Sequence, residues 1–129
     1  MRSPENIDYA AFANQLGEFL LNVATKVGDY IHQHAGTGED LTAQYKQLDQ
    51  LTQYGNKCFE LAEKIAFTGL AVYLKGIKDA TDKINRDLKK LANINKAIAI
   101  TAAVLGLAVG VLTQNGSAVS DALQTITHL

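Results

Sequence analysis

The sequence predicts an all-α fold, an elongated antiparallel bundle of three long helices followed by a short C-terminal helix. The only proline is Pro4, so no internal proline breaks a helix. Apolar residues recur at spacings of three and four, the pattern of one helix face, and the alternating pattern of strands is absent. With 129 residues, 47% of them apolar, the chain is predicted to form one domain, residues 1–129, with its own core.

The first predicted helix covers about residues 5–34. Ser3 and Pro4 suit its start, as an N-cap followed by proline at the first helical position. Gly36 suits its end, because glycine adopts the left-handed conformation at low cost. The apolar stripe between these signals consists of Tyr9, Phe12, Leu16, Phe19, Val23 and Tyr30, flanked by Leu20, Val27 and Ile31. This helix is expected to turn that stripe toward the bundle.

Two further long helices are predicted, one from about Glu39 to a break near Gly76 and one from about Lys78 to Thr113. The apolar stripe of the helix that starts near Glu39 consists of Leu48, Leu51, Gly55, Cys58, Ala62, Ile65, Gly69 and Val72. The apolar stripe of the helix that starts near Lys78 consists of Ile84, Leu88, Leu91, Asn95 (its one polar member), Ile98, Ala102, Leu105, Val109 and Leu112. Residues 114–116 predict a stop, and Ser117 is the expected cap of the short last helix.

Charge is distributed unevenly along the chain. The net charge is −1, but residues 1–64 carry five basic and nine acidic residues, and residues 65–96 carry seven basic and three acidic residues. Residues 97–129 contain a single charged residue, Asp121. An acidic half, a basic stretch and an apolar stretch therefore follow one another in order.

Residues 97–112 are the most distinctive segment of the sequence. Thirteen of these sixteen residues are Ala, Val, Ile or Leu, so a helix here is apolar on every side and excludes an ordinary surface position. Its length of about 24 Å falls short of the roughly 30 Å hydrocarbon core of a membrane. Two interpretations remain open, a core or subunit-interface helix and a membrane-associated segment.

The candidate site residues come from this segment and from the basic stretch before it. Ala102, Gly106 and Gly110 form a row of small residues that permits close helix packing, and we place the packing centre around Leu105 to Gly110. The apolar candidates are Ile98, Ala102, Leu105, Gly106, Val109, Gly110 and Leu112. The basic candidates, expected to contact a partner or anionic headgroups, are Lys83, Arg86, Lys89, Lys90 and Lys96.

No residue pattern of an enzyme is found in the sequence. It contains no phosphate-binding glycine loop, no HExxH, no CxxC and no GxSxG motif. His32 and His34 lie two residues apart and point to different sides of a helix, which does not suit a shared metal ion. No catalytic residues, metal ligands or cofactors are therefore predicted. Nucleic acid is not an expected partner, because acidic residues interrupt the basic stretch and the pI is near 6.3.

The leading functional hypothesis is a non-enzymatic interaction protein that self-associates or binds another helical protein through its apolar helix faces. The alternative is a membrane-active protein that docks on an anionic membrane by its basic helix and then inserts residues 97–112. That layout is similar to the general layout of helical pore-forming toxins. The N-terminal residues lack the pattern of a signal peptide, so the expected location is cytoplasmic, or outside the cell after export without a cleavable signal. The alternative adds peripheral membrane association.

Overall fold

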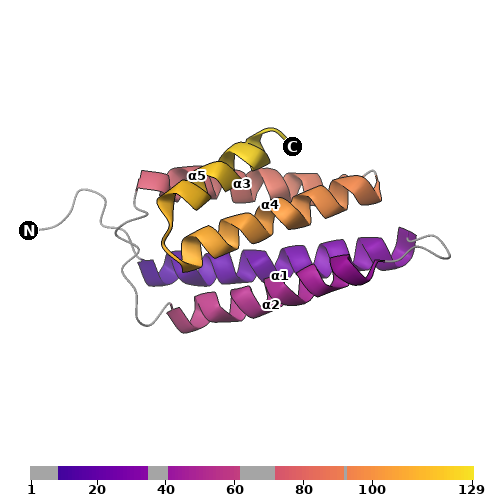
Figure 1. Ribbon diagram of the computed structural model, residues 1–129, viewed down its shortest axis with the longest axis horizontal. Coiled ribbons are helices and arrows are strands. Elements are labelled where there is room, and N and C mark those ends of the chain that lie inside the picture. Colours follow the sequence, from indigo (N-terminus) through magenta and orange to yellow (C-terminus); the bar gives the residue numbers. More distant parts are fainter. Residues whose placement is uncertain (1–8, 35–40, 62–71, 92) are drawn as a thin grey trace, which may run out of the picture.

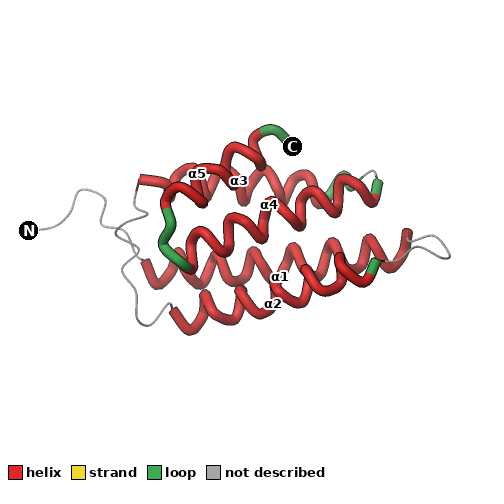
Figure 2. Tube along the Cα trace, viewed as in Figure 1, coloured by secondary structure: helices red, strands yellow, loops and turns green. Residues whose placement is uncertain are grey.

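The computed structural model describes residues 9–34, 41–61, 72–91 and 93–129, and every regular element among them is helical. The helices are α1 (Tyr9–His34), α2 (Thr42–Leu61), α3 (Leu74–Leu88), α4 (Ile94–Leu112) and α5 (Gly116–Thr127) (Figure 1, Figure 2). The predicted all-α fold class is confirmed. The start predicted at Ser3 and Pro4 and the stop at Gly36 lie outside the described residues.

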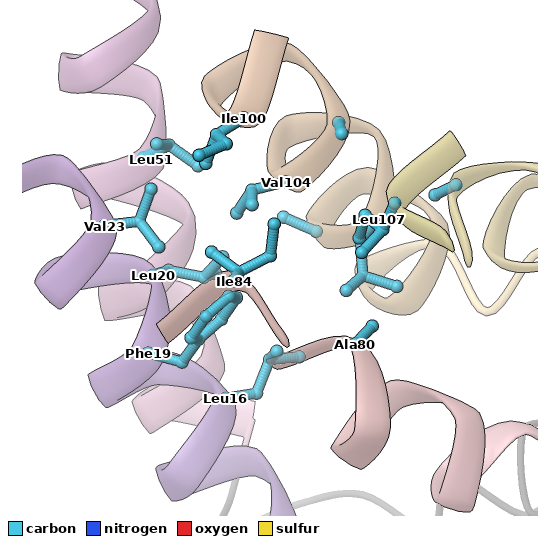
Figure 3. Packing of buried hydrophobic residues seen from close by; sticks show 14 of the residues in the cluster. Leu16, Phe19, Leu20, Val23, Leu51, Ala80, Ile84, Ile100, Val104 and Leu107 are labelled. Carbon is cyan, nitrogen blue, oxygen red and sulfur yellow. The ribbon is translucent and has the colours of Figure 1, made fainter. Parts of the chain in front are cut away.

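Helix α4 lies at the centre of the arrangement. α1 and α2 form an antiparallel pair, α4 packs against both, and α3 and α5 lie on the side away from α2 (Figure 1). α5 folds back along α4, and α3 contacts α1 and α5. The apolar residues of all five helices form one buried cluster, in which α4 supplies the central row (Figure 3).

The single helix predicted over residues 78–113 is instead two helices, α3 and α4. α3 ends at Leu88, and the backbone turns at Lys89 and Lys90. Asn93 is the N-cap of α4, where its side chain accepts a hydrogen bond of 2.8 Å from the backbone N–H of Lys96. Asparagine is a preferred residue at this position because its side-chain oxygen satisfies a free helical N–H group. Asn95, predicted on the apolar stripe, is exposed.

The predicted break at Gly76 is also wrong. α3 begins at Leu74 and includes Gly76 in its first turn, where a Cβ atom would lie 3.1 Å from Leu123 of α5. Val72, assigned to the apolar stripe, is 84% exposed. The described part of the preceding helix ends at Leu61, and the predicted stripe residues from 62 to 71 lie outside the described residues.

The connection from α4 to α5 is a Schellman motif, a paired set of hydrogen bonds that closes a helix C-terminus. Asn115 N–H donates to the Gly110 carbonyl (2.9 Å), and Gln114 N–H donates to the Val111 carbonyl (3.0 Å). Gln114 has φ of 52°, the left-handed conformation that glycine usually adopts there. The cap of α5 is Asn115, which accepts from Ala118 N–H at 3.1 Å, so the predicted cap at Ser117 is wrong.

Replacing Gln114 with glycine is expected to stabilise the fold by about 0.5–1 kcal/mol. A non-glycine residue in the left-handed region is strained by its Cβ atom, and glycine removes that strain. Urea unfolding of Gln114→Gly measures the change. As a matched control, Gln53→Gly at an exposed interior position of α2 is expected to destabilise by about 0.5–1 kcal/mol. Destabilisation in both variants would show that the strain at Gln114 is negligible.

α1 and α2 approach each other through a pair of glycines. A Cβ atom on Gly17 would lie 2.8 Å from the Gly55 carbonyl oxygen, and a Cβ atom on Gly55 would lie 3.0 Å from the Gly17 carbonyl oxygen. Both glycines are buried. The two backbones are therefore in direct contact at this crossing, which only residues without a side chain permit.

Candidate interaction site

Helix α4 has one buried side and one accessible side. Its inward residues are Ala97, Ile100, Thr101, Ala103, Val104, Leu107, Ala108, Gly110 and Val111. The single polar side chain in this group is satisfied, because the Thr101 hydroxyl donates to the Ala97 carbonyl at 2.9 Å. On the other side Ala102, Gly106 and Val109 are exposed, at spacings of four and three. These three residues and the neighbouring Ala99 and Leu105 are called the outer stripe below.

The outer stripe forms the base of an open groove. Helices α2 and α5 are its two walls, and its volume is about 770 Å³. α2 contributes Gln50 and Tyr54, and α5 contributes Ala118, Asp121, Ala122 and Thr125. Most of the groove surface is apolar, and Asp121 is the only charged side chain among the described residues that line it. A surface of this kind suits an apolar helix better than a polar small molecule.

The groove continues between α2 and the C-terminal end of α4. A second hollow of about 380 Å³ shares Tyr54 and Val109 with the first and adds Leu112 and Thr113 of α4. Lys57 and Glu60 of α2 lie at its edge, and the Lys57 ammonium lies 5.9 Å from the centre of the Tyr54 ring. The accessible side of α4 therefore extends from Ala99 to Thr113 as one continuous surface.

The two glycines predicted near the packing centre have different surroundings. A Cβ atom on Gly110 would lie 2.9 Å from the backbone nitrogen and the side chain of Val119, so this glycine lets α5 approach within the chain. A Cβ atom on Gly106 would meet only Ala122, at 3.8 Å, which is ordinary van der Waals contact. Gly106 thus leaves room at the base of the groove.

The structure brings part of the predicted apolar set together. Ala102, Leu105, Gly106 and Val109 all line the groove, and Leu112 lines its continuation. Ile98 is half-buried and lines neither hollow, and Gly110 belongs to the core.

The predicted basic residues gather where α3 turns into α4. Lys83 Nζ lies 3.1 Å from Asp87 Oδ2, and Lys96 Nζ lies 4.0 Å from the same oxygen. Lys96 also donates to the Leu129 carbonyl at 2.8 Å, beside the end of the groove that Leu129 lines. Arg86, Lys89 and Lys90 are exposed, and they form no ion pair with any described residue.

α4 also has the dimensions and composition of a membrane-spanning helix. It has 19 residues, its most apolar 18-residue window has a mean hydropathy of 1.9, and half of that window is buried in the fold. The core helix of a soluble protein meets the same criterion of length and composition. Length and hydropathy alone are therefore weak support for a membrane role.

Among the described residues, no group of three or more His, Cys, Asp or Glu side chains is placed to hold a metal ion. The His34 ring packs on Tyr30, with ring centres 4.2 Å apart. Cys58 is fully buried, and burial raises the pKa of its thiol to about 11. At neutral pH it is therefore a protonated core residue and a poor nucleophile.

Sequence reasoning missed the walls of the groove. The α5 residues Ala118, Asp121, Ala122 and Thr125 repeat at spacings of three, one and three, the pattern of one helix face. That pattern identifies a face, but it does not reveal that the face lies beside α4. Tyr54 belongs to α2 and is distant from the outer stripe in sequence, so only the fold places it in the groove.

The chain matches no protein-family model, and comparisons with curated proteins and with solved structures find no similar protein.

Proposed function

We propose that this is a non-enzymatic interaction protein that binds an apolar helix in the groove over α4, either from a second copy of the chain or from another helical protein. The observation that carries the proposal is the open apolar groove lined by the outer stripe, between α2 and α5. A large apolar surface exposed to water is unfavourable in a monomer and typical of an interaction site. Val109 is the one large apolar side chain of the outer stripe that is exposed to water, and 41% of its surface is accessible.

The shape of the groove favours a helical occupant. Its lining follows α4 from Ala99 to Val109 with α2 and α5 on either side, and small residues line its base, so the axis of an incoming helix can come close to that of α4. Ala102 and Gly106 lie one turn apart at the middle of this base. Small side chains at the closest point increase the van der Waals contact between two helices.

The test is the effect of Ala102→Glu and Gly106→Leu on assembly. Both residues are exposed, so each variant changes the groove and leaves the core of the monomer intact. Gly106→Leu fills the base of the groove, and overpacking of an interface costs about 1–3 kcal/mol. That cost corresponds to an increase in Kd of about 5- to 150-fold. Sedimentation equilibrium over a range of protein concentrations measures it.

Ala43→Glu is the matched control, because Ala43 is an exposed alanine of α2 that lines none of the described hollows. It adds the same charge as Ala102→Glu and is expected to leave the mass unchanged. Self-association is wrong if the wild-type protein is a monomer at every concentration. The assignment of the groove is wrong if the wild-type protein assembles and both groove variants assemble equally well.

A second candidate function, membrane activity, is favoured by the combination of α4 with the exposed basic residues at the turn between α3 and α4. α4 is long and apolar enough to span a bilayer, and Arg86, Lys89 and Lys90 are exposed beside it. Each basic residue near an anionic surface contributes about 1 kcal/mol of attraction. Insertion would require α4 to leave the core cluster to which it contributes a row of buried residues, which is why this function ranks second.

Flotation with anionic vesicles separates the two functions. Electrostatic docking followed by insertion predicts flotation at low salt that decreases strongly at high salt, because ions screen the charges. Replacement of Arg86, Lys89 and Lys90 by glutamine should abolish flotation, and replacement of three lysines that lie outside the α3–α4 turn, Lys46, Lys57 and Lys75, should not. Protein that remains in the soluble fraction at both salt concentrations contradicts the membrane function.

A further inference from the structure

α1 and α3 line a pocket that is separate from the groove over α4. Its volume is about 380 Å³, within the range of small-molecule sites. Leu16 of α1 and Ile77 of α3 are 2% and 1% exposed and form its inner surface. Phe12 and Leu74, both partly buried, form its sides. The interior of the pocket is therefore apolar.

The rim of the pocket is polar and cationic. Lys75 and Lys78 lie one turn apart on α3 with both side chains exposed, and the Gln15 amide and Thr81 hydroxyl complete the rim. Acidic side chains are absent from the described residues that line it. Asp82 lies outside the lining, 3.7 Å from Lys78 Nζ, and both side chains of this pair are more than half exposed. Such an exposed pair is weak and leaves the ammonium group available.

The pocket is closed in the direction of the core. Phe19, one turn beyond Leu16 on α1, is 6% exposed. Ile84, one turn beyond Thr81 on α3, is fully buried. Both residues belong to the core cluster shown in Figure 3. The pocket therefore spans one turn of α1 and two turns of α3. This length is too short for a helix-binding groove and suits a compact ligand.

We infer that the α1–α3 pocket binds a free single-chain fatty carboxylate, with the acyl chain against Leu16 and Ile77 and the carboxylate beside Lys75 and Lys78. The charges are complementary, since the described residues around the apolar interior include two ammonium groups and no carboxylate. A water molecule occupies about 30 Å³ in the liquid, so 380 Å³ holds roughly a dozen groups of that size, the size of a medium-length acyl chain. This site is independent of the proposed interaction function.

The experiment is calorimetric titration of the full chain with dodecanoate below its micellar concentration, with dodecanol in a parallel titration. Saturable binding of one dodecanoate per chain is expected, with dodecanol at least tenfold weaker. Lys75→Gln combined with Lys78→Gln should raise the Kd for dodecanoate about tenfold, because a charge-assisted contact is lost. Lys89→Gln combined with Lys90→Gln removes the same charge elsewhere and should leave the Kd unchanged.

One further variant and one vesicle experiment complete the test. Leu74→Glu places a negative charge at the side of the pocket and should abolish binding, and circular dichroism shows whether that variant is folded. Vesicles of phosphatidylglycerol test the lipid source of the same anionic chemistry. The inference is overturned if dodecanoate does not bind, if dodecanol binds equally well, if both lysine pairs have equal effects, or if binding occurs only to vesicles.

Discussion

Replacing Leu107 with alanine is expected to lower the free energy of unfolding by about 2–5 kcal/mol. Leu107 is fully buried on the inward side of α4, in the core cluster that joins all five helices. Alanine removes the buried methyl groups and leaves a cavity that its neighbours fill only in part. A loss of this size is a large fraction of the stability of a small domain. Urea unfolding followed by circular dichroism measures it.

Val109→Ala is the control on the same helix. Val109 lies two residues away, on the outer stripe, and is 41% exposed. Truncation there removes little buried surface and is expected to cost less than about 1 kcal/mol in the monomer. Equal losses for Leu107→Ala and Val109→Ala would contradict the division of α4 into a buried and an accessible side.

Replacing Gly17 with alanine is expected to destabilise the protein by about 1–3 kcal/mol. The new Cβ atom would lie 2.8 Å from the Gly55 carbonyl oxygen and 2.8 Å from Phe59 Cε1. The ring can move, but the carbonyl belongs to the backbone of α2, so the two helices would have to separate. Thermal and urea unfolding both report this change.

Gly28→Ala tests whether this effect comes from the helix crossing. Gly28 lies in the same helix, where a Cβ atom would meet only Leu48 Cδ1 at an ordinary 3.6 Å. Without a steric cost, alanine should stabilise the protein by about 0.5–1 kcal/mol through its higher helix propensity. The two glycine variants of α1 are therefore expected to change stability in opposite directions. A stabilising Gly17→Ala would show that the backbones do not meet at this crossing.

Helical periodicity predicted the fold class and the buried faces of α1 and α2. It did not predict the buried face of α4, where the predicted stripe of Ala102, Leu105 and Val109 lies on the accessible side. The stripe over residues 5–34 contains Leu16, Phe19 and Val23, all of which are buried in α1. A helix contributes the same periodic signal wherever it packs, so such faces can be recognised without knowledge of their neighbours. Periodicity does not reveal where a helix ends when apolar residues continue on both sides of the end. The break before α4 depends on the capping hydrogen bond of Asn93. Asn93 stands among other polar residues, including Lys90, Asn95 and Lys96, so the sequence alone does not identify it as a cap.

The candidate site could be predicted only in part. The apolar composition of residues 97–112 indicated that α4 requires extensive coverage, and the structure shows which side the chain itself covers. The roles of Gly106 and Gly110 could not be separated from sequence, because both occur in the same small-residue row. Their surroundings depend on α5, which contacts Gly110 through Val119 and reaches Gly106 only at 3.8 Å.

Coverage of the outer stripe of α4 on assembly is tested by the maleimide reaction rate of Ala102→Cys, measured at increasing protein concentration under reducing conditions. Cys58 contributes little background, because its pKa of about 11 leaves almost no thiolate at neutral pH. Ala43→Cys on the exposed side of α2 is the reference variant. Assembly through the groove predicts that the rate for Ala102→Cys falls as the protein concentration rises, while the rate for Ala43→Cys stays constant. A rate for Ala102→Cys that does not change with concentration, or that falls equally in both variants, would contradict it.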